Sequence, residues 1–477
     1  MPRSGKFGVN FSTLCLKMTY QDQIQALKAE NAQLTTLLTQ ALARITELEA
    51  LVLKSSTVKT SKNSSKPPST DLGRKNQSLR PKSDKPVGGQ FGHKGRTLKM
   101  IDTPDVTEKI YPDFCNNCGL SLQGAAFDLV DRRQVIDIPP IVPITTEYQR
   151  FGVGCSCGHH QVGSFPEGVT NHVQYGKNIQ SLVVYQSYYQ FLPFARLQDF
   201  FKKVCHVNIG KGTIENIIRR TAKKAQPVYE YLQQAIVVSF FVGSDETGFK
   251  MNRLKYWFWV WQNAMVTYIV AASSRSKQVI ADNFPDGLPN SILCSDRLAA
   301  QLSTITKGNQ ICLAHLLREL NYLIEAEQHT WAMEFKTLLA DAIRLKQTQN
   351  AYDKDDERVK NIEQIAVKLL DAIIWNQQFD DKVKYKQTIT FFNGMVKLKH
   401  ALFPFLYHKD IPFDNNGSER AFRMVKVKTK ISGQFKSLHQ EFAVIRSVID
   451  TAIKNGQSVF NAIKVLVDAP VPEKAAG

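Results

Sequence analysis

The chain has 477 residues, which is too long for one ordinary domain and enough for about three or four. Its 61 lysines and arginines outnumber its 43 acids, and the formal charge of +18 favours a polyanionic partner such as nucleic acid. The sequence has no apolar run of transmembrane length and no recognisable secretory signal, so we expect a cytoplasmic protein without a membrane partner. Four of the eight cysteines form two tight pairs, which indicates a reducing compartment and a metal site rather than disulfides.

Residues 20–54 follow a heptad repeat, which is typical of a coiled-coil helix. One position of the repeat carries Ile24, Asn31, Leu38, Ile45 and Val52, and the other carries Leu27, Leu34, Ala41 and Leu48. A buried amide such as that of Asn31 favours two strands in one register, at some cost in stability. The pattern predicts a parallel coil that joins the chain into a homodimer or a higher oligomer. The alternative is a surface helix that packs on its own protein.

The next segment, residues 55–104, is rich in Ser, Pro, Gly and Lys, so we predict a basic flexible arm without a core. Between Lys54 and Lys99, twelve lysines and arginines are accompanied by only two acids. Such an arm can follow a DNA backbone and become ordered on binding, with Lys94 and Arg96 as candidate contacts. The alternative is a solvated linker.

Residues 105–172 contain the two cysteine pairs, Cys115 with Cys118 and Cys155 with Cys157. Each pair is followed by a glycine, as in the two knuckles that hold one tetrahedral zinc ion. We therefore predict a zinc ribbon with a structural Zn²⁺ and with strands at 132–138 and 144–153. The second pair has a short spacing, so His159 or His160 could replace one sulfur. The alternative is four unliganded cysteines.

Residues 173–232 are predicted to be a helical domain similar to a helix-turn-helix. A helix over 194–204, a turn that ends in Gly210 and a helix from Thr213 follow one another. Arg219 and Arg220, near the end of the second helix, are candidate DNA contacts. The same spacing also occurs in ordinary helical bundles.

Residues 233–436 are predicted to form a catalytic α/β domain that begins with a strand over 235–247. A hairpin over 255–261 and 266–271, a crossing helix over 276–283 and a strand that ends at Asp296 follow. This order is typical of a ribonuclease H-like fold, in which the first and fourth strands lie side by side. We therefore expect Asp245 and Asp296 to meet, whereas Glu246 points to the opposite face of its strand.

A third acid, Glu419, follows a helical insertion at about 320–400 and stands at the start of a helix. Three carboxylates suit two Mg²⁺ or Mn²⁺ ions, which can stabilise both the attacking and the leaving oxygen at phosphorus. Four cations, Arg420, Arg423, Lys426 and Lys430, form a stripe on this helix that we expect to contact DNA. A solvated basic face is the alternative. Residues 437–477 are expected to form a C-terminal helix and a tail.

His315 and Arg318 lie between the second and third acids. One interpretation is a contact to a phosphate near the metals, and the other is a half-buried histidine at a helix start. A wider set of short segments occurs from the coil to about residue 434: Asn63-Ser64-Ser65-Lys66-Pro67-Pro68, Gly88-Gly89-Gln90, Gly92-His93-Lys94-Gly95, both cysteine pairs, Gln174-Tyr175-Gly176, Leu192-Pro193-Phe194-Ala195-Arg196, Gly212-Thr213, Asp245-Glu246-Thr247, Cys312 with Ala314-His315 and Arg318, and Asp414-Asn415-Asn416 with Glu419-Arg420.

With these segments the chain resembles the insertion sequence 66 family of bacterial transposases. The resemblance implies a DDE transposase of the bacterial nucleoid with a ribonuclease H-like domain and with Asp245, Asp296 and Glu419 as its acids. It also implies Mg²⁺-dependent cutting at the 3′ ends of the element, transfer of those ends into target DNA, and accessory proteins of the same element as further partners. Two departures are Arg297-Leu298 in place of the usual Gly-Tyr, where a cation could weaken metal binding, and an altered basic run at 426–430.

The sequence therefore predicts a multidomain α/β protein in which a ribonuclease H-like core follows a coiled coil, a zinc ribbon and a helical domain. Its function is predicted to be two-metal phosphoryl transfer without a covalent protein–DNA intermediate. Two alternatives are a nuclease that only hydrolyses DNA and a non-catalytic DNA-binding protein, either a decayed or a recruited transposase.

Overall fold

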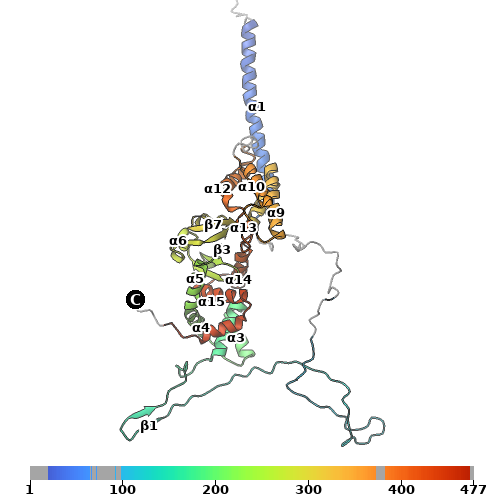
Figure 1. Cartoon of the computed structure of the whole chain (residues 1–477), viewed down its shortest axis with the longest axis vertical. Coiled ribbons are helices and arrows are strands. Elements are labelled where there is room, and N and C mark those ends of the chain that lie inside the picture. Colours follow the sequence, from blue (N-terminus) through green and yellow to red (C-terminus); the bar gives the residue numbers. More distant parts are fainter. Residues whose placement is uncertain are drawn as a thin grey trace, which may run out of the picture. The chain divides into compact units, whose positions relative to one another are not determined.

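The computed structural model describes residues 20–64, 66, 71, 92, 98–371 and 382–472. These divide into two compact units (Figure 1). The first unit draws on residues up to 72, on 167–198 and on those from 210 onward, and the second on 73–166 and 199–209. None of the described helices combines the length and the apolar character that a membrane crossing requires.

A five-stranded sheet forms the centre of the first unit, in the order β5-β4-β3-β6-β7. The strands are β3 (Phe241–Met251), β4 (Leu254–Gln262), β5 (Thr267–Ala272), β6 (Leu288–Ser295) and β7 (Thr306–Ile311). The first three are antiparallel, whereas β6 pairs parallel with β3 and β7 pairs parallel with β6. The predicted hairpin and the predicted neighbourhood of the first and fourth strands are both confirmed.

The predicted first strand was too long at its start. Helix α5 (Gln226–Val237) includes the beginning of the apolar run, and β3 starts only at Phe241. Leu232 and Ile236 are buried four residues apart, so the helical period continues into the run. The hydrophobic pattern of a short apolar run does not distinguish a strand from a buried helix.

One face of the sheet buries tryptophans beneath α5 and α6 (Lys277–Asn283), including the stacked pair Trp259 and Trp261. A phenylalanine cluster lies on β3 and β4, where Phe249 and Phe258 stack with ring centroids 4.1 Å apart and Phe442 meets Phe258 at 5.7 Å. Two aromatic cores, contributed by alternating residues of the same strands, therefore hold the sheet between its helices.

The C-terminal helix α15 (His439–Lys454) lies along the free edge of β5. The amides of Thr267 and Ile269 donate to the hydroxyls of Thr451 at 3.1 Å and Ser447 at 2.9 Å. An edge strand that is covered in this way cannot pair with another chain. The predicted C-terminal helix is therefore part of the core, and α16 (Val459–Asp468) follows it.

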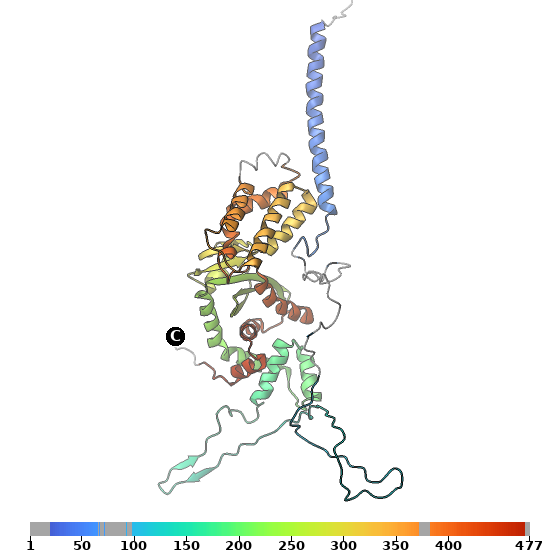
Figure 2. The same cartoon turned by 45° about the vertical axis from the view of Figure 1, so that its right-hand side comes forward.

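The segment for which the sequence predicts a helical insertion is helical. It contains α8 (Leu313–Glu327), α9 (Thr330–Thr348), α10 (Glu357–Leu369), α12 (Lys386–Lys397), the 3₁₀ turn η3 (Lys399–Ala401) and α13 (Pro404–Tyr407). Figure 2 shows these helices, in yellow to orange, gathered at one end of the sheet. A core that includes Trp331, Phe335, Phe391 and Phe392 holds them together.

The segment before the sheet is helical, with α2 (Lys177–Val184), the π-helical turn η2 (Tyr185–Tyr189), α3 (Phe194–Lys203) and α4 (Lys211–Lys224). Both helices of the predicted pair are thus present. Helix α4 buries Ile214, Ile217 and Ile218, and it packs against α2, α15 and α16. Helices α2 and α4 therefore form one bundle with the C-terminal helices α15 and α16.

In the second unit, the only strands among the described residues are β1 (Gly152–Gly154) and β2 (His160–Val162), which form a short hairpin. The predicted strand at 132–138 is absent, and that at 144–153 is reduced to its last two residues. Val135 and Ile144 are both 92% exposed. The alternating residues meet no partner strand or core, and such strands need burial for stability.

Helix α1 (Tyr20–Ser56) follows the predicted heptad segment, and its apolar side chains are exposed, as at Leu34 and Leu38. The start of the predicted arm is not extended but docks on α8. Asn63 is 3% exposed and its amide Nδ2 donates to Glu325 at 2.5 Å, while Asn321 donates to the Lys62 carbonyl at 2.9 Å. The partners on α8 lie more than 250 residues away in the sequence, so local composition could not reveal this docking.

We expect Ser447→Ala to lower the free energy of unfolding by about 1–3 kcal/mol, because the buried amide of Ile269 loses its acceptor. Urea denaturation measures the change. Ser303→Ala is the matched control, since its hydroxyl is exposed and bonds only within its own turn. Equal stability of the two variants would contradict the role of α15 at the strand edge.

Candidate active site

An acidic cluster lies where β3 and β6 run side by side. One ligand oxygen from each of Asp245, Glu246 and Asp296 lies within 4.8 Å of the others, and no other group of three or more potential metal ligands occurs in the described part of the chain. Phe241 pairs with Ile292 in the parallel register, and the same offset of 51 residues leads from Asp245 to Asp296. The predicted meeting of these two acids is therefore confirmed.

Glu246 was expected to stand apart, and this expectation was wrong. It does alternate with Asp245, because Glu246 lies opposite Trp259 on β4 and Asp245 opposite Val260. Its carboxylate nevertheless reaches Asp245 and Asp296 and is held there by two donors. Arg275 Nε donates to it at 2.8 Å and Gln301 Nε2 at 3.1 Å.

These two donors could not be identified from the sequence, because they arrive from the loop after β5 and from α7 (Ala299–Leu302). The one available signal was the presence of two acids in succession on an apolar strand. With both oxygens of Glu246 hydrogen-bonded, its carboxylate is less free to bind a metal than those of Asp245 and Asp296.

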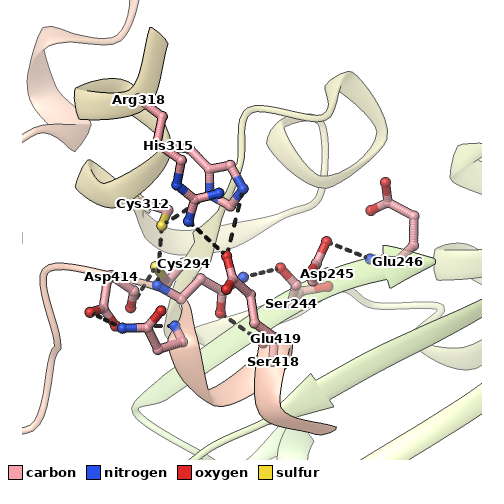
Figure 3. Close-up of polar contacts among 12 residues, drawn as sticks. Ser244, Asp245, Glu246, Cys294, Cys312, His315, Arg318, Asp414, Ser418 and Glu419 are labelled. Atoms are coloured by element: carbon pink, nitrogen blue, oxygen red, sulfur yellow. Dashed lines mark hydrogen bonds and ion pairs between the residues drawn. The ribbon is translucent and has the colours of Figure 1, made fainter. Parts of the chain in front are cut away.

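Glu419 lies beside this cluster, in the first turn of α14 (Asn416–Ser432), and Figure 3 shows it between α8 and β3. Its carboxylate accepts a hydrogen bond from Arg318 at 3.1 Å, and His315 Nε2 lies 3.8 Å away. Glu419 does not belong to the group of three, but its charge contributes to the raised pKa of Asp245. The structure thus joins Asp245 with Asp296 and holds Glu419 nearby between two basic side chains of α8.

The electrostatics of the cluster favour bound protons in the metal-free protein. Burial, and then the charges of Asp296 and Glu246, raise the pKa of Asp245 to about 8. Burial also raises the pKa of Glu246 to about 7, against the opposing effect of Arg275. Crowded carboxylates in a buried place cannot all be ionised unless a cation joins them.

The residues of this cluster fit a divalent metal ion. Asp296 Oδ1 is buried and has no hydrogen-bond partner in the described part of the chain, which leaves a lone pair free for a ligand bond. Carboxylate oxygens are what Mg²⁺ and Mn²⁺ prefer, whereas zinc more often takes nitrogen and sulfur. Asp245 and Asp296 would hold such an ion, with Glu419 or Glu246 as a third ligand.

A buried polar network fixes the helix that carries Glu419. The side-chain Nδ2 of Asn415 donates to the carbonyl of Ser244 at 2.7 Å, and the backbone N–H of Asn415 donates to Cys312 Sγ at 3.2 Å. The hydroxyl of Ser418 donates to Asn415 Oδ1 at 2.7 Å. Asn415 is the N-cap residue, but its side chain contacts β3 instead of capping the helix. It therefore ties α14 to the residue next to Asp245.

Two glycines allow this close approach. A Cβ atom at Gly243 would lie 2.5 Å from Gln262 Nε2 and 2.7 Å from Asn415 Oδ1, and one at Gly417 would lie 2.4 Å from Gln262 Nε2. Gln262 is itself buried and accepts from Lys454 at 2.8 Å. No side chain fits at either position without displacing the network, because these contacts are shorter than van der Waals separation.

The predicted DNA contacts differ in their surroundings. Arg420, Arg423, Lys426 and Lys430 are all exposed along α14. Within the described chain, no acid lies within ion-pair distance of these four, which suits a surface that is free for phosphate. Arg219 instead pairs with Glu441 of α15 at 2.9 Å, and Arg220 is exposed. Lys94 and Arg96 lie outside the described residues.

The two cysteine pairs form separate turns. The amide of Gly119 donates to the Cys115 carbonyl at 2.8 Å, and that of Gly158 to the Cys155 carbonyl at 2.9 Å, with positive φ at both glycines. Neighbouring backbone amides lower the pKa of Cys115 and Cys155, as in knuckles that bind metal. Among the described residues, however, the four cysteines do not form one ligand group, either with one another or with His159 or His160.

We expect Asp245→Asn to stabilise the metal-free protein increasingly as the pH rises. The folded protein keeps the proton of Asp245 up to about pH 8, whereas the unfolded chain releases it near 3.8, so wild type loses stability across that range. Melting temperatures in a chelating buffer from pH 4 to 8 measure the difference. Two parallel curves would show that this carboxyl does not titrate abnormally.

We also expect Asn415→Ala to lower the free energy of unfolding by about 1–3 kcal/mol, because the Ser244 carbonyl loses its buried partner. Asn416→Ala is the control, since the Asn416 side chain is exposed and bonds only to Asp414. Chemical denaturation compares the two. An equal loss in both variants would mean that the network does not hold α14 in place.

Comparison with known proteins agrees with this site. No curated protein matches the chain. Residues 18–99 match the model of a family of unknown function, DUF6444. Residues 172–441, which include the sheet, the insertion, the acidic cluster and Glu419, match the model described as Transposase IS66 family. That match extends over more than half of the chain, and the chain therefore belongs to the IS66 family of transposases.

Proposed function

We propose that this protein is a DDE transposase, which cuts the ends of its insertion sequence and joins the 3′ ends to target DNA. The observation that carries the proposal is the convergence of Asp245 and Asp296 on neighbouring strands, with Glu419 beside them on α14. Three antiparallel strands followed by two parallel ones, in the order β5-β4-β3-β6-β7, support a ribonuclease H-like core.

In this mechanism Asp245 and Asp296 would hold the metal ions, and Glu419 would supply the third carboxylate. Bound Mg²⁺ or Mn²⁺, as a pair, would activate a water or a 3′-hydroxyl and stabilise the charge that develops at phosphorus. Binding displaces the protons that the crowded acids retain, so the affinity for metal increases with pH. Arg318 holds the Glu419 carboxylate through an ion pair at 3.1 Å.

The DNA strand would bind along the cationic stripe of α14. Arg420, on the solvent side of the helix, follows Glu419 directly, so a strand bound along the stripe passes the acidic cluster. Guanidinium and ammonium groups contact phosphates without reading sequence, and their contribution weakens with salt. The basic arm and Arg220 would add contacts of the same kind.

The N-terminal part would assemble and orient the enzyme. The exposed apolar seam of α1 fits a second copy of the chain in a parallel coil, which gives a homodimer or a higher oligomer. Closing the two cysteine turns around one structural Zn²⁺ would complete a ribbon, since both turns already direct backbone amides toward sulfur. Accessory proteins of the same element are further candidate partners.

The test uses purified protein, Mg²⁺, labelled element ends and a target plasmid. We expect joined product from wild type and a decrease of about 1000-fold in Asp245→Asn, Asp296→Asn and Glu419→Gln, since several kcal/mol of transition-state stabilisation depend on each ligand. Glu246→Gln should decrease the joined product by only about tenfold, because the Glu246 carboxylate is already hydrogen-bonded and less free to bind metal. Glu334→Gln, on the exposed surface of α9, is the control.

Each alternative function predicts a different product. Cut ends without joining would indicate a nuclease. Retarded but intact DNA, insensitive to Asp245→Asn, would indicate a non-catalytic DNA-binding protein. Full activity of Glu419→Gln together with loss of activity in Glu246→Gln would assign the third carboxylate to Glu246.

A further inference from the structure

Arg297, which directly follows Asp296, has an unusual backbone conformation. Its φ of +75° lies in the left-handed region. A side chain with a Cβ atom is disfavoured there, and such residues persist where the surrounding structure over-determines them. The residue is therefore held in place by something other than its own conformational preference.

Two contacts with the helical insertion hold it. The guanidinium forms an ion pair with Glu319 on α8. It also lies over the ring of Phe391 on α12, with 5.3 Å between Cζ and the ring centroid. The Arg297 side chain is 23% exposed and that of Glu319 is 41% exposed, so the ion pair is only partly shielded from water. Its charge is thus paired with Glu319 of the insertion.

The backbone at this point determines where the Asp296 carboxylate points. Strand β6 ends at Ser295, and α7 begins at Ala299, so Asp296 lies in a short link between them. Asp296 Oδ1 is buried and has no hydrogen-bond partner among the described residues. No hydrogen bond from the described part of the chain therefore fixes the direction of this oxygen, and the backbone of the link is a candidate for that role.

We propose that Arg297 is a positioning residue for Asp296. Its side chain connects the link to Glu319 and Phe391 and thereby maintains the left-handed backbone that directs the Asp296 carboxylate into the cluster. The inference rests on the proposed function only in taking the cluster to be a metal site. On this view the helical insertion also controls the orientation of the Asp296 carboxylate.

Three substitutions separate the backbone role from the side-chain role. Arg297→Ala removes the connection but keeps a Cβ atom, whereas Arg297→Gly removes it and adopts positive φ without strain. Glu319→Gln weakens the connection and leaves Arg297 in place. Arg253 is the matched control, because it is exposed in the β3–β4 turn with a φ of +71°.

The primary readout is Mn²⁺ affinity, measured from the free-ion signal in electron paramagnetic resonance, with Asp245→Asn defining site-specific binding. We expect Arg297→Ala to bind Mn²⁺ about tenfold more weakly, as for other residues that orient a ligand. The Mn²⁺ affinity of Arg297→Gly should lie within about twofold of wild type. Adding Glu319→Gln to Arg297→Gly should not change that affinity further. Arg253→Ala and Arg253→Gly should both bind like wild type.

Wild-type Mn²⁺ affinity in Arg297→Ala would overturn the proposal. An Arg297→Gly variant as weak as Arg297→Ala would also overturn it, since the side chain would then act directly. If Asp245→Asn binds as much Mn²⁺ as wild type, the proposed metal site itself fails. The metal-free melting temperatures then decide the inference: a lower value for Arg297→Ala than for Arg297→Gly supports the connection, and equal values reject it.

Discussion

Parallel pairing of β3 with β6 is the constraint on which the site depends. The pairing places the middle of β3, which carries Asp245, beside the end of β6, which Asp296 directly follows. Burial, together with the negative charge that is concentrated there, raises the pKa of Asp245 to about 8. The fold tolerates the repulsion because aromatic cores on both faces stabilise the same strands. A divalent cation would relieve it.

The remaining parts of the site are brought to this point by packing against β3. Helix α14 approaches closely because Gly243 and Gly417 leave room for Gln262 and Asn415. Helix α8 supplies Arg318 to the third acid, so the insertion contributes to the electrostatics of the site as well as to the stability of the domain. Insertion and sheet form one functional unit that belongs to a DNA-processing enzyme family.

Much of the architecture could be predicted from the sequence, because it depends on local pattern. The β4–β5 hairpin, the strand that ends before Asp296 and the helical insertion follow from period and turn spacing, which neighbouring residues determine. The strands predicted in the cysteine region are absent or shortened because they lack support from outside the local pattern. Alternation alone does not make a strand when no partner lies opposite it.

Only the tertiary structure decided that Glu246 joins the cluster and that Arg297 pairs with Glu319. The physical reason is that both outcomes depend on partners supplied by other elements. Burial, charge pairing and backbone strain are properties of those contacts, and no local pattern encodes them.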